Sequence, residues 1–298
     1  MKTTSTLSTM QKNPAKRVEP NAVRALVLRS AGTNCDGETV RGLELAGAAT
    51  SLLHLNAVAR DPALLAEQEI LVLPGGFSYG DYVAAGRVFG LELRQRLLEP
   101  LQRFVADGGL LVGICNGFQI LVELGLFEPD ERARAIALTD NASNRFECRW
   151  VTLRSEASAA AWIVPGELMP VPVAHGEGRF VVRDREVLER LFANRQVVLC
   201  YADPEQPGRA PLGPDAPLLP YPLNPNGSIA NIAGLCDPTG RVLGLMPHPE
   251  RNLAPWHHPR WTRLGTRREG EGLSFYRRLV AAARLTPASI TRLHTHQP

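Results

Sequence analysis

Cys115 is the first residue of the sequence whose setting suggests chemistry. It lies in GLLVGICNGFQILVELG (109–125), between an apolar run and an apolar helical stretch, with Gly113 and Gly117 two positions to either side. This spacing is typical of a nucleophile elbow, because the glycines leave room for a sharp strand-to-helix turn. The free amides and positive dipole of a helix N-terminus favour a thiolate. Cys115 is therefore a candidate nucleophile, and the alternative is a buried structural cysteine.

A histidine and a glutamate follow a second apolar run near the other end of the chain, in RVLGLMPHPER (241–251). In an extended segment residues two apart project to the same side, so His248 and Glu250 can touch. A carboxylate on one imidazole nitrogen fixes the tautomer and supports the cation formed at the other. Pro247 and Pro249 predict that the pair is held extended. A chance surface tripeptide is the alternative, but both candidate segments follow strands, whose carboxyl ends line the ligand crevice of open α/β sheets.

Acyl transfer from an amide also needs two N–H donors for the developing oxyanion. The amide of Asn116 directly follows the candidate nucleophile. The second donor is expected from the Pro74-Gly75-Gly76 turn after the run ILVL, because glycines let the backbone approach a ligand closely. We therefore expect one oxyanion donor at Asn116 and a second within this turn, against the alternative that this segment is a simple turn.

Strands and helices alternate in the first half of the chain. Four short apolar runs each precede a turn signal, at 24–30, 49–55, 69–76 and 109–114, and continuous apolarity suits strands covered on both faces. Amphipathic stretches at 38–48 and 90–109 predict helices, and in the second of these we expect a shared face of Leu91, Leu97, Leu98, Leu101 and Phe104. This alternation predicts an α/β fold with a mostly parallel central sheet.

The pattern changes after about residue 145, where strand-like pieces follow one another with few helices between them. We expect additional mixed or antiparallel strands in this half, one of them spanning VPVAHGEGRFVV, and a closing helix at 272–285. The proline-rich stretch 203–225 predicts a long ordered or semi-ordered loop. Residues 1–22 are Thr/Ser/Lys-rich, and we expect a disordered extension there in preference to an organellar transit peptide.

Composition narrows the class of protein. The 298 residues carry a formal net charge of +3, which is too small to indicate a nucleic-acid or membrane partner. The sequence has no run of about 18 uncharged apolar residues, and its first 20 residues lack the apolar run of a signal peptide, so we expect neither a membrane span nor export by that route. Five scattered cysteines without a CxxC pair suit a reducing, cytoplasmic setting. Cys148, Cys200 and Cys236 fall in apolar runs and are expected in the core, whereas Cys35 has no assigned role.

Seven segments together carry a resemblance to a known family. They are SAGTNCDGE (30–38), LPGGFSYGDYVAAG (73–86), GICNGFQIL (113–121), NASNRFECRW (141–150), VAHGEGRF (173–180), YPLNPNGSIANIAGL (221–235) and GLMPHPER (244–251). The chain resembles class I, triad-type glutamine amidotransferases, and more narrowly the glutaminase subunits of phosphoribosylformylglycinamidine synthase. The resemblance spans about residues 24–285 and implies a flavodoxin-like, three-layer sandwich, so we expect the amidotransferase domain at 23–285 and a tail at 286–298.

The resemblance also implies the roles of particular residues. Cys115 would form a glutamyl thioester, His248 would act as general base and acid, and Glu250 would orient it. The amides of Gly76 and Asn116 would form the oxyanion hole. Glutamine would be held by four further positions, Gly75, Gln119, Arg145 and Phe146. The ammonia would pass to a synthetase subunit that converts formylglycinamide ribonucleotide to formylglycinamidine ribonucleotide, with a small bridging subunit as a possible third component.

No cofactor is expected in this chain itself. Because it has no GxxxxGK[ST] loop, ATP and Mg²⁺ are expected on the partner synthetase. No metal site is predicted either, because the paired histidines at 257/258 and 294/296 lack accompanying acids or cysteines. Two other functions stay open at this point: a cysteine hydrolase or stress protein of the same fold that acts without a partner, and a non-catalytic scaffold subunit.

Overall fold

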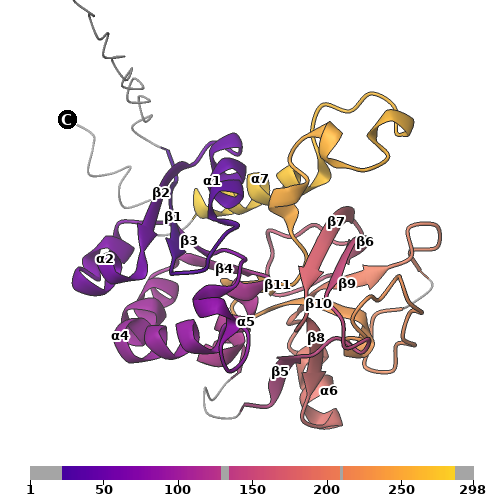
Figure 1. Ribbon diagram of the computed structural model, residues 1–298, viewed down its shortest axis with the longest axis horizontal. Coiled ribbons are helices and arrows are strands. Elements are labelled where there is room, and N and C mark those ends of the chain that lie inside the picture. The colour runs from indigo at the N-terminus through magenta and orange to yellow at the C-terminus, as the bar shows by residue number, and fades with distance from the viewer. Residues whose placement is uncertain (1–21, 129–133, 209–210, 286–298) are drawn as a thin grey trace, which may run out of the picture.

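A mixed sheet of nine strands forms the centre of the computed structural model, which describes residues 22–128, 134–208 and 211–285 (Figure 1). The strand order is β2-β1-β3-β4-β11-β10-β9-β6-β7. A separate two-stranded sheet pairs β5 with β8. The strands are β1 (Arg24–Arg29), β2 (Ala49–His54), β3 (Ile70–Leu73), β4 (Leu110–Ile114), β5 (Ile136–Thr139), β6 (Glu147–Ser155), β7 (Leu168–His175), β8 (Arg179–Val182), β9 (Val197–Ala202), β10 (Ile232–Cys236) and β11 (Val242–Leu245).

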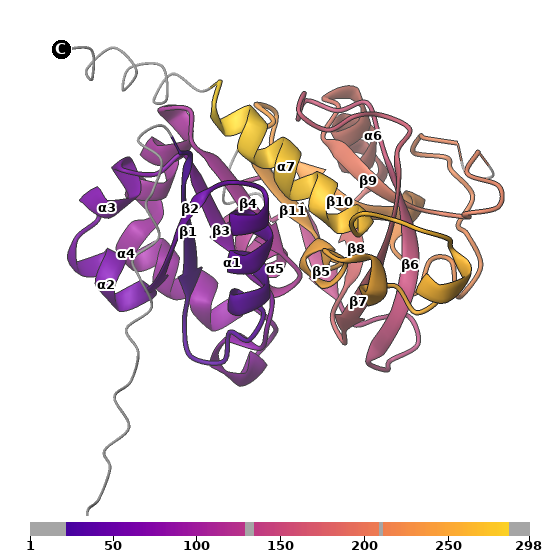
Figure 2. The same cartoon turned by 90° about the horizontal axis from the view of Figure 1, so that it is seen from above.

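The first five strands of this order pair in parallel, and β3, β4 and β11 consist entirely of buried residues. Helices cover both faces: α1 packs against α7 on one side and α4 against α5 on the other (Figure 2). This is the flavodoxin-like order, so the predicted α/β three-layer sandwich is confirmed. The helices are α1 (Asp36–Leu45), α2 (Leu55–Arg60), α3 (Ala63–Ala66), α4 (Arg87–Ala106), α5 (Asn116–Leu124), α6 (Arg185–Ala193) and α7 (Glu271–Ala283).

The remaining four strands, β10, β9, β6 and β7, extend the sheet by antiparallel pairing, as the second half of the sequence predicts. The expected single strand over VPVAHGEGRFVV is instead two strands, β7 and β8, in different sheets. Gly176, Glu177 and Gly178 form the break between them. The prediction of a loop over 203–225 is confirmed for the described part of that stretch, which consists of turns and irregular backbone.

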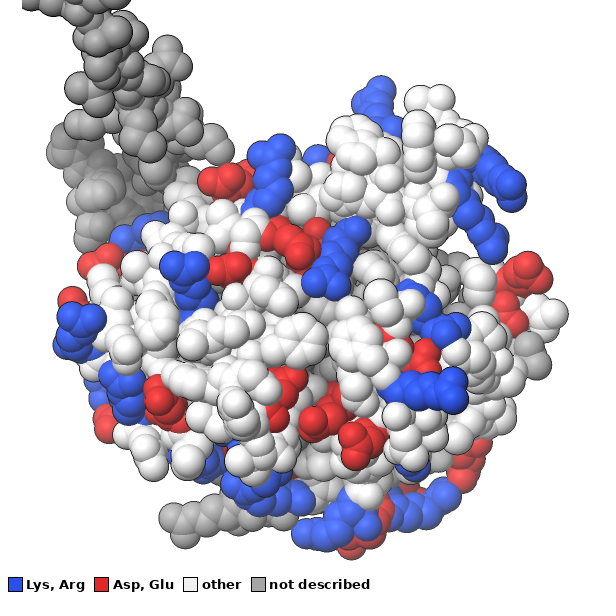
Figure 3. Space-filling model, in the orientation of Figure 1, with Lys and Arg blue, Asp and Glu red and all other residues white. Residues whose placement is uncertain are grey.

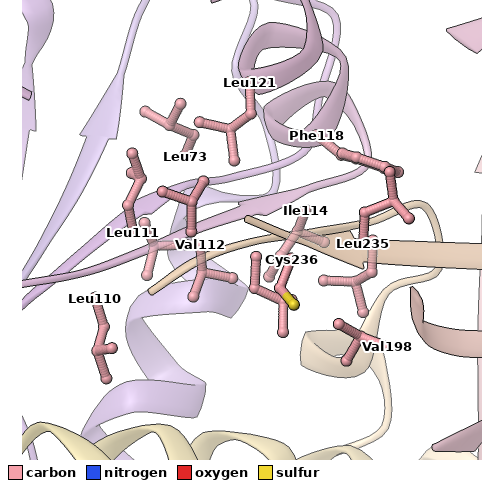
Figure 4. Close-up of a cluster of buried hydrophobic side chains, with 14 of the residues drawn as sticks. Leu73, Leu110, Leu111, Val112, Ile114, Phe118, Leu121, Val198, Leu235 and Cys236 are labelled. Atoms are coloured by element: carbon pink, nitrogen blue, oxygen red, sulfur yellow. The ribbon is translucent and has the colours of Figure 1, made fainter. Parts of the chain in front are cut away.

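The hydrophobic core lies between the sheet and its covering helices. Figure 4 shows part of it, where Phe118 and Leu121 of α5 meet side chains of β3, β4 and β10. Two predictions about single residues were wrong. Leu91 is 52% exposed, because Phe89 and Leu93 supply that part of the apolar face of α4, and Cys148 is exposed although Cys200 and Cys236 are buried as expected.

The surface of the described part is chemically mixed. Figure 3 shows basic and acidic side chains interspersed over the face seen there. None of the helices formed by the described residues is long and apolar enough to cross a membrane. The predicted extension at 1–22 lies outside the described residues except for Ala22, and the predicted tail at 286–298 lies wholly outside them.

Candidate active site

Cys115 sits at a tight turn between β4 and α5. Its backbone has φ of 51°, and its amide donates a hydrogen bond of 2.8 Å to the carbonyl oxygen of Leu245. A Cβ on Gly113 would lie 2.5 Å from the carbonyl oxygen of Gly117, and one on Gly117 would lie 1.9 Å from that of Leu73. The backbone therefore excludes side chains on both flanks of the cysteine, which is the geometry expected of a nucleophile elbow.

His248 and Glu250 lie beside this turn because β11 runs parallel to β4, with Leu245 in register with Ile114. The Nδ1 atom of His248 and the Oε1 atom of Glu250 are 2.6 Å apart, and the two side chains are 2% and 0% exposed. The backbone amide of His248 donates to the carbonyl oxygen of Pro172 on β7 at 2.9 Å. The two halves of the sheet thus fix the histidine between them.

The expected extended backbone at this pair was wrong. Pro249 begins a short 3₁₀ helix, η3 (Pro249–Arg251), so Glu250 is reached by a tight turn. Proline is well tolerated at the first position of a helix, where its missing N–H would have no intrahelical acceptor. The predicted contact between His248 and Glu250 forms nevertheless, because the turn brings the carboxylate back onto the imidazole.

The side chains of Cys115 and His248 both lie against Gly75. The point where a Cβ on Gly75 would lie is 2.9 Å from Cε1 of His248 and 3.4 Å from Cβ of Cys115. Among the described residues the Nε2 atom of His248 has no hydrogen-bond partner, although it is buried. This nitrogen is therefore available for proton transfer at the sulfur.

The electrostatic surroundings of His248 favour its protonated form. Burial by itself lowers the pKa of this imidazole, but the carboxylate of Glu250 and the sulfur of Cys115 outweigh it and raise the pKa well above its ordinary value. An imidazolium beside the nucleophile is the state that stabilises a thiolate and can protonate a leaving nitrogen. The buried Glu250 carboxylate is thus an electrostatic part of the site as well as an orienting one.

The residues predicted as oxyanion donors lie beside the elbow. Asn116 is the first residue of α5, where amides have no intrahelical acceptor. Gly76 follows β3 with φ of 142°, and a Cβ on it would lie 2.6 Å from the amide nitrogen of Asn34. Gly75 is in contact distance of both Cys115 and His248, as described above. Gly75 and Asn116 therefore lie next to Cys115, and Gly76 adjoins Gly75 along the chain.

The predicted glutamine contacts divide into two groups. Arg145 and Phe146 are exposed in the turn before β6, and the Phe146 ring packs against Phe77 with 6.2 Å between centroids, directly after the Gly75-Gly76 turn. Gln119 is buried, and both ends of its amide are engaged within the protein. Its Oε1 accepts from Asn116 at 3.0 Å, and its Nε2 donates to the carbonyl oxygen of Glu177 at 2.5 Å.

Two carboxylates without a predicted role lie close to this amide network. Asp81 accepts from the Asn116 side chain at 3.4 Å, and Glu177 accepts from the amide of Ala85 at 3.2 and 3.3 Å. Burial, with repulsion from Glu177 second, raises the pKa of Asp81 to about 6. Asp81 ends the segment GGFSYGD, and Glu177 lies in HGEG. These two segments are therefore the signal in the sequence that could have identified both residues.

A second buried histidine was also missed. His175 ends β7, and its Nδ1 lies 3.0 Å from the side-chain oxygen of Asn141, while its Nε2 has no partner among the described residues. Burial, reinforced by the nearby His248, lowers the pKa of His175 to about 3. This imidazole is therefore neutral next to a charged one, and its tautomer follows from the bond to Asn141.

Cys35, for which the sequence predicts no role, lies close to His248 and Glu250 in the structure. Cys35 is 1% exposed, and it is the residue immediately before α1. Arg251 donates to its sulfur at 3.1 Å, and this sulfur lies within 4.8 Å of ligand atoms of both His248 and Glu250. Only the fold could show this, because Cys35 and the other three residues lie in opposite halves of the chain.

Comparisons with known proteins agree with this geometry. Residues 22–281 match the family model of the CobB/CobQ-like glutamine amidotransferase domain. The phosphoribosylformylglycinamidine synthase subunit PurQ of Dehalococcoides mccartyi is 42% identical over 264 residues, which cover 88% of this chain and 98% of that protein. The PurQ subunit of Treponema denticola is 41% identical over 244 residues, covering 77% and 88% of the two chains.

Solved structures give the same result. A chain in the structure of PurLQS from Thermotoga maritima is 32% identical with a TM-score of 0.61, over 86% of this chain and 97% of that one. The glutaminase domain of Trypanosoma brucei CTPS, solved with bound acivicin, shares the fold alone, with 11% identity, a TM-score of 0.51 and coverage of 89% and 95%. The elbow, the histidine–glutamate pair and these likenesses lead to one conclusion: the chain belongs to the PurQ family of phosphoribosylformylglycinamidine synthase subunits, within the CobB/CobQ-like glutamine amidotransferases.

Proposed function

We propose that this chain is the glutaminase subunit of a phosphoribosylformylglycinamidine synthase, which hydrolyses L-glutamine to glutamate and ammonia. The observation that carries the proposal is the convergence of Cys115 with the buried pair of His248 and Glu250 at one edge of the parallel sheet. The names of the PurQ relatives and of the PurLQS structure support the same reaction.

The first half of the reaction uses Cys115 as the nucleophile. Its sulfur attacks the side-chain amide carbon of glutamine, and the carbonyl oxygen becomes an oxyanion. Protonated His248 then gives its Nε2 proton to the departing nitrogen, so that the C–N bond breaks and ammonia leaves a glutamyl thioester. The raised pKa of His248 suits this donation, because the imidazole carries its proton before the nitrogen departs.

The second half of the reaction returns the site to its starting state. Neutral His248 takes a proton from water, and the resulting hydroxide attacks the thioester carbonyl. The C–S bond breaks, glutamate leaves and the Cys115 thiolate is restored beside the imidazolium. Glu250 keeps Nδ1 protonated throughout and supports the charge on the ring.

Backbone amides around the elbow would stabilise both tetrahedral intermediates. We assign this role to the amides of Gly76 and Asn116, of which the second lies at the positive end of α5. Gly75, with Arg145 and Phe146, would form the walls that hold glutamine, and the guanidinium of Arg145 suits its α-carboxylate. Gln119 would act indirectly, because its amide already bonds Asn116 and Glu177.

The ammonia is used elsewhere. We infer that a synthetase subunit binds ATP, Mg²⁺ and formylglycinamide ribonucleotide and receives the ammonia, with a small bridging subunit as a further component. The PurLQS structure supports such an assembly. Glutamine is the small-molecule partner of this chain, and we expect the complex in the cytoplasm, where its five free cysteines would stay reduced.

The decisive experiment compares wild type with Cys115→Ser in the assembled synthase. We expect the variant to lose glutamine-dependent glutamate release and product formation, while product formation from added ammonium salt continues at the wild-type rate. Retained glutamine hydrolysis in Cys115→Ser would refute the assignment of the nucleophile. Loss of both activities in a correctly folded complex would contradict the division of labour between the subunits.

A further inference from the structure

The buried cluster of Cys35, His248 and Glu250 has the donor set of a zinc site. The cysteine sulfur, an imidazole nitrogen and a carboxylate oxygen all lie within 4.8 Å of one another, and all three residues are buried. Zn²⁺ binds these three atom types at about 2.0–2.3 Å, so tetrahedral ligands lie about 3.5 Å apart. Side-chain shifts of about 1 Å would therefore close the cluster around an ion.

Within the described part of the chain, two of the three residues of this cluster also carry an atom without a hydrogen-bond partner. Among the described residues, Nε2 of His248 and Oε2 of Glu250 have no hydrogen-bond partner, although both side chains are almost wholly buried. The catalytic mechanism uses the first of these atoms but leaves the second unexplained. A buried carboxylate oxygen without a partner is costly, and a bound cation would satisfy it.

A surface cavity lies next to Glu250, at one side of the cluster. A cavity of about 400 Å³ opens between α1 and the segment after β11 and extends to Glu250. The residues that line it are Glu38, Arg41, Glu250, Arg251, Leu253 and His257. Arg251 contacts the Cys35 sulfur and opposes a cation there, but its side chain is 32% exposed and can turn to solvent.

We propose that Cys35, His248 and Glu250 bind Zn²⁺ and that the bound ion reversibly inhibits the glutaminase. Binding displaces the thiol proton of Cys35 and the proton on the His248 ring nitrogen that takes the ion, so the affinity rises with pH. A metal ion on either ring nitrogen removes His248 from catalysis. On Nε2 the ion blocks proton transfer at Cys115, and on Nδ1 it displaces the Glu250 carboxylate from the ring. Mg²⁺, which prefers an all-oxygen shell, does not compete for a thiolate and imidazole. The inhibitory consequence rests on the proposed function, whereas the binding does not.

The binding test uses the full chain with Zn²⁺ in calorimetry and Co²⁺ as an absorbing substitute. In a Cys115→Ser background, which keeps the proposed ligands, we expect one ion per chain and a thiolate-to-Co²⁺ absorption band. Adding Cys35→Ser or Cys35→Ala should abolish the band and weaken Zn²⁺ binding at least about tenfold. The exposed Cys148→Ser is the matched control and should change neither. A band that survives without Cys35 would overturn the proposal.

The inhibition test uses the assembled synthase with chelator-buffered Zn²⁺. Wild type should lose glutamine hydrolysis and regain it with excess chelator, while ammonia-driven synthesis continues. Cys35→Ser should need at least about ten times more free Zn²⁺ for half-inhibition. Equal sensitivity of the two proteins would show that Cys115 and His248 alone hold the ion, against the proposal. Zinc binding in a chain that hydrolyses no glutamine would instead count against the proposed function alone.

Discussion

At the scale of single residues, the site depends on a few buried charges that are balanced by one another. The Glu250 carboxylate is completely buried and is paired with a histidine whose pKa it raises. Near them, burial and repulsion from Glu177 raise the pKa of the Asp81 carboxyl. These two acids therefore differ in their effect: the first stabilises a neighbouring charge, whereas the second is itself destabilised when ionised.

Glu250→Gln keeps the size of the side chain but removes its charge. We expect kcat for glutamine hydrolysis to fall by about 10²- to 10⁴-fold. The reason is that no carboxylate then fixes the tautomer of the imidazole or stabilises its protonated form. Since Glu250 raises the pKa of His248, its removal lowers that pKa, and the alkaline limb of the pH–rate profile should move to lower pH. Glu99→Gln, at an exposed ion pair on α4, is the control. An unmoved alkaline limb would contradict this account.

Asp81→Asn should stabilise the fold in a pH-dependent way. Because its folded pKa of about 6 exceeds the ordinary 3.8, the carboxylate costs stability fully above pH 6 and not at all below pH 3.8. After discounting for partial exposure, we expect a gain of about 1 kcal/mol at about pH 8 and almost none at about pH 4. Urea unfolding at both pH values measures this. A loss of stability at the higher pH would show that the carboxylate is needed for its hydrogen bonds.

At the scale of elements, the turn from β4 into α5 depends on close backbone packing. Gly117→Ala places a Cβ 1.9 Å from the Leu73 carbonyl oxygen, so β3 or α5 must move. We expect a loss of about 1–3 kcal/mol in unfolding free energy and a fall in glutaminase kcat. Gly37→Ala in α1, where nothing lies within 4 Å of the new Cβ, should instead gain up to about 1 kcal/mol. Equal stabilities of the two variants would contradict the steric argument.

The sequence could predict those elements whose signals are local. Continuous apolar runs predicted the buried parallel strands, and the glycine spacing around Cys115 predicted its turn, because both follow from neighbouring residues. The prediction for Leu91 was wrong because other apolar residues of α4 fit the same helical period and take the buried positions instead. The prediction for Cys148 was wrong because this residue lies on the more exposed face of β6. Cys35 and His175 could not be assigned, because what they contact depends on segments far away in the sequence.

At the scale of the whole molecule, the site joins parts that are remote along the chain. Cys115 follows β4 in the parallel half, whereas the amide of His248 donates to the carbonyl oxygen of Pro172 in the antiparallel half. Helix α7 connects the two halves, since it packs on α1 of the parallel half, on β7 of the antiparallel half and on η3. The amide of Gly272, at its N-terminus, donates to the carbonyl oxygen of Asn252 at 2.9 Å. The closing helix therefore holds the turn that carries Glu250.

This arrangement predicts that a small change in α7 reaches the catalytic site. A Cβ on Gly272 would lie 2.0 Å from the carbonyl oxygen of Pro249, so Gly272→Ala must push η3 away from the helix. Helix propensity alone would make this change stabilising by about 1 kcal/mol. We expect instead a lower unfolding free energy and at least about a tenfold fall in glutaminase kcat, because a misplacement of about 1 Å costs much of the rate.

The matched control is Ala281→Gly, at an exposed position of the same helix. It should cost about 1 kcal/mol in unfolding free energy through helix propensity, yet leave kcat unchanged. Comparing kcat with unfolding free energy in the two variants separates the position of η3 from the general stability of α7. If Gly272→Ala kept full glutaminase activity, or if both variants lost activity in proportion to stability, the helix would only complete the fold and would not position Glu250.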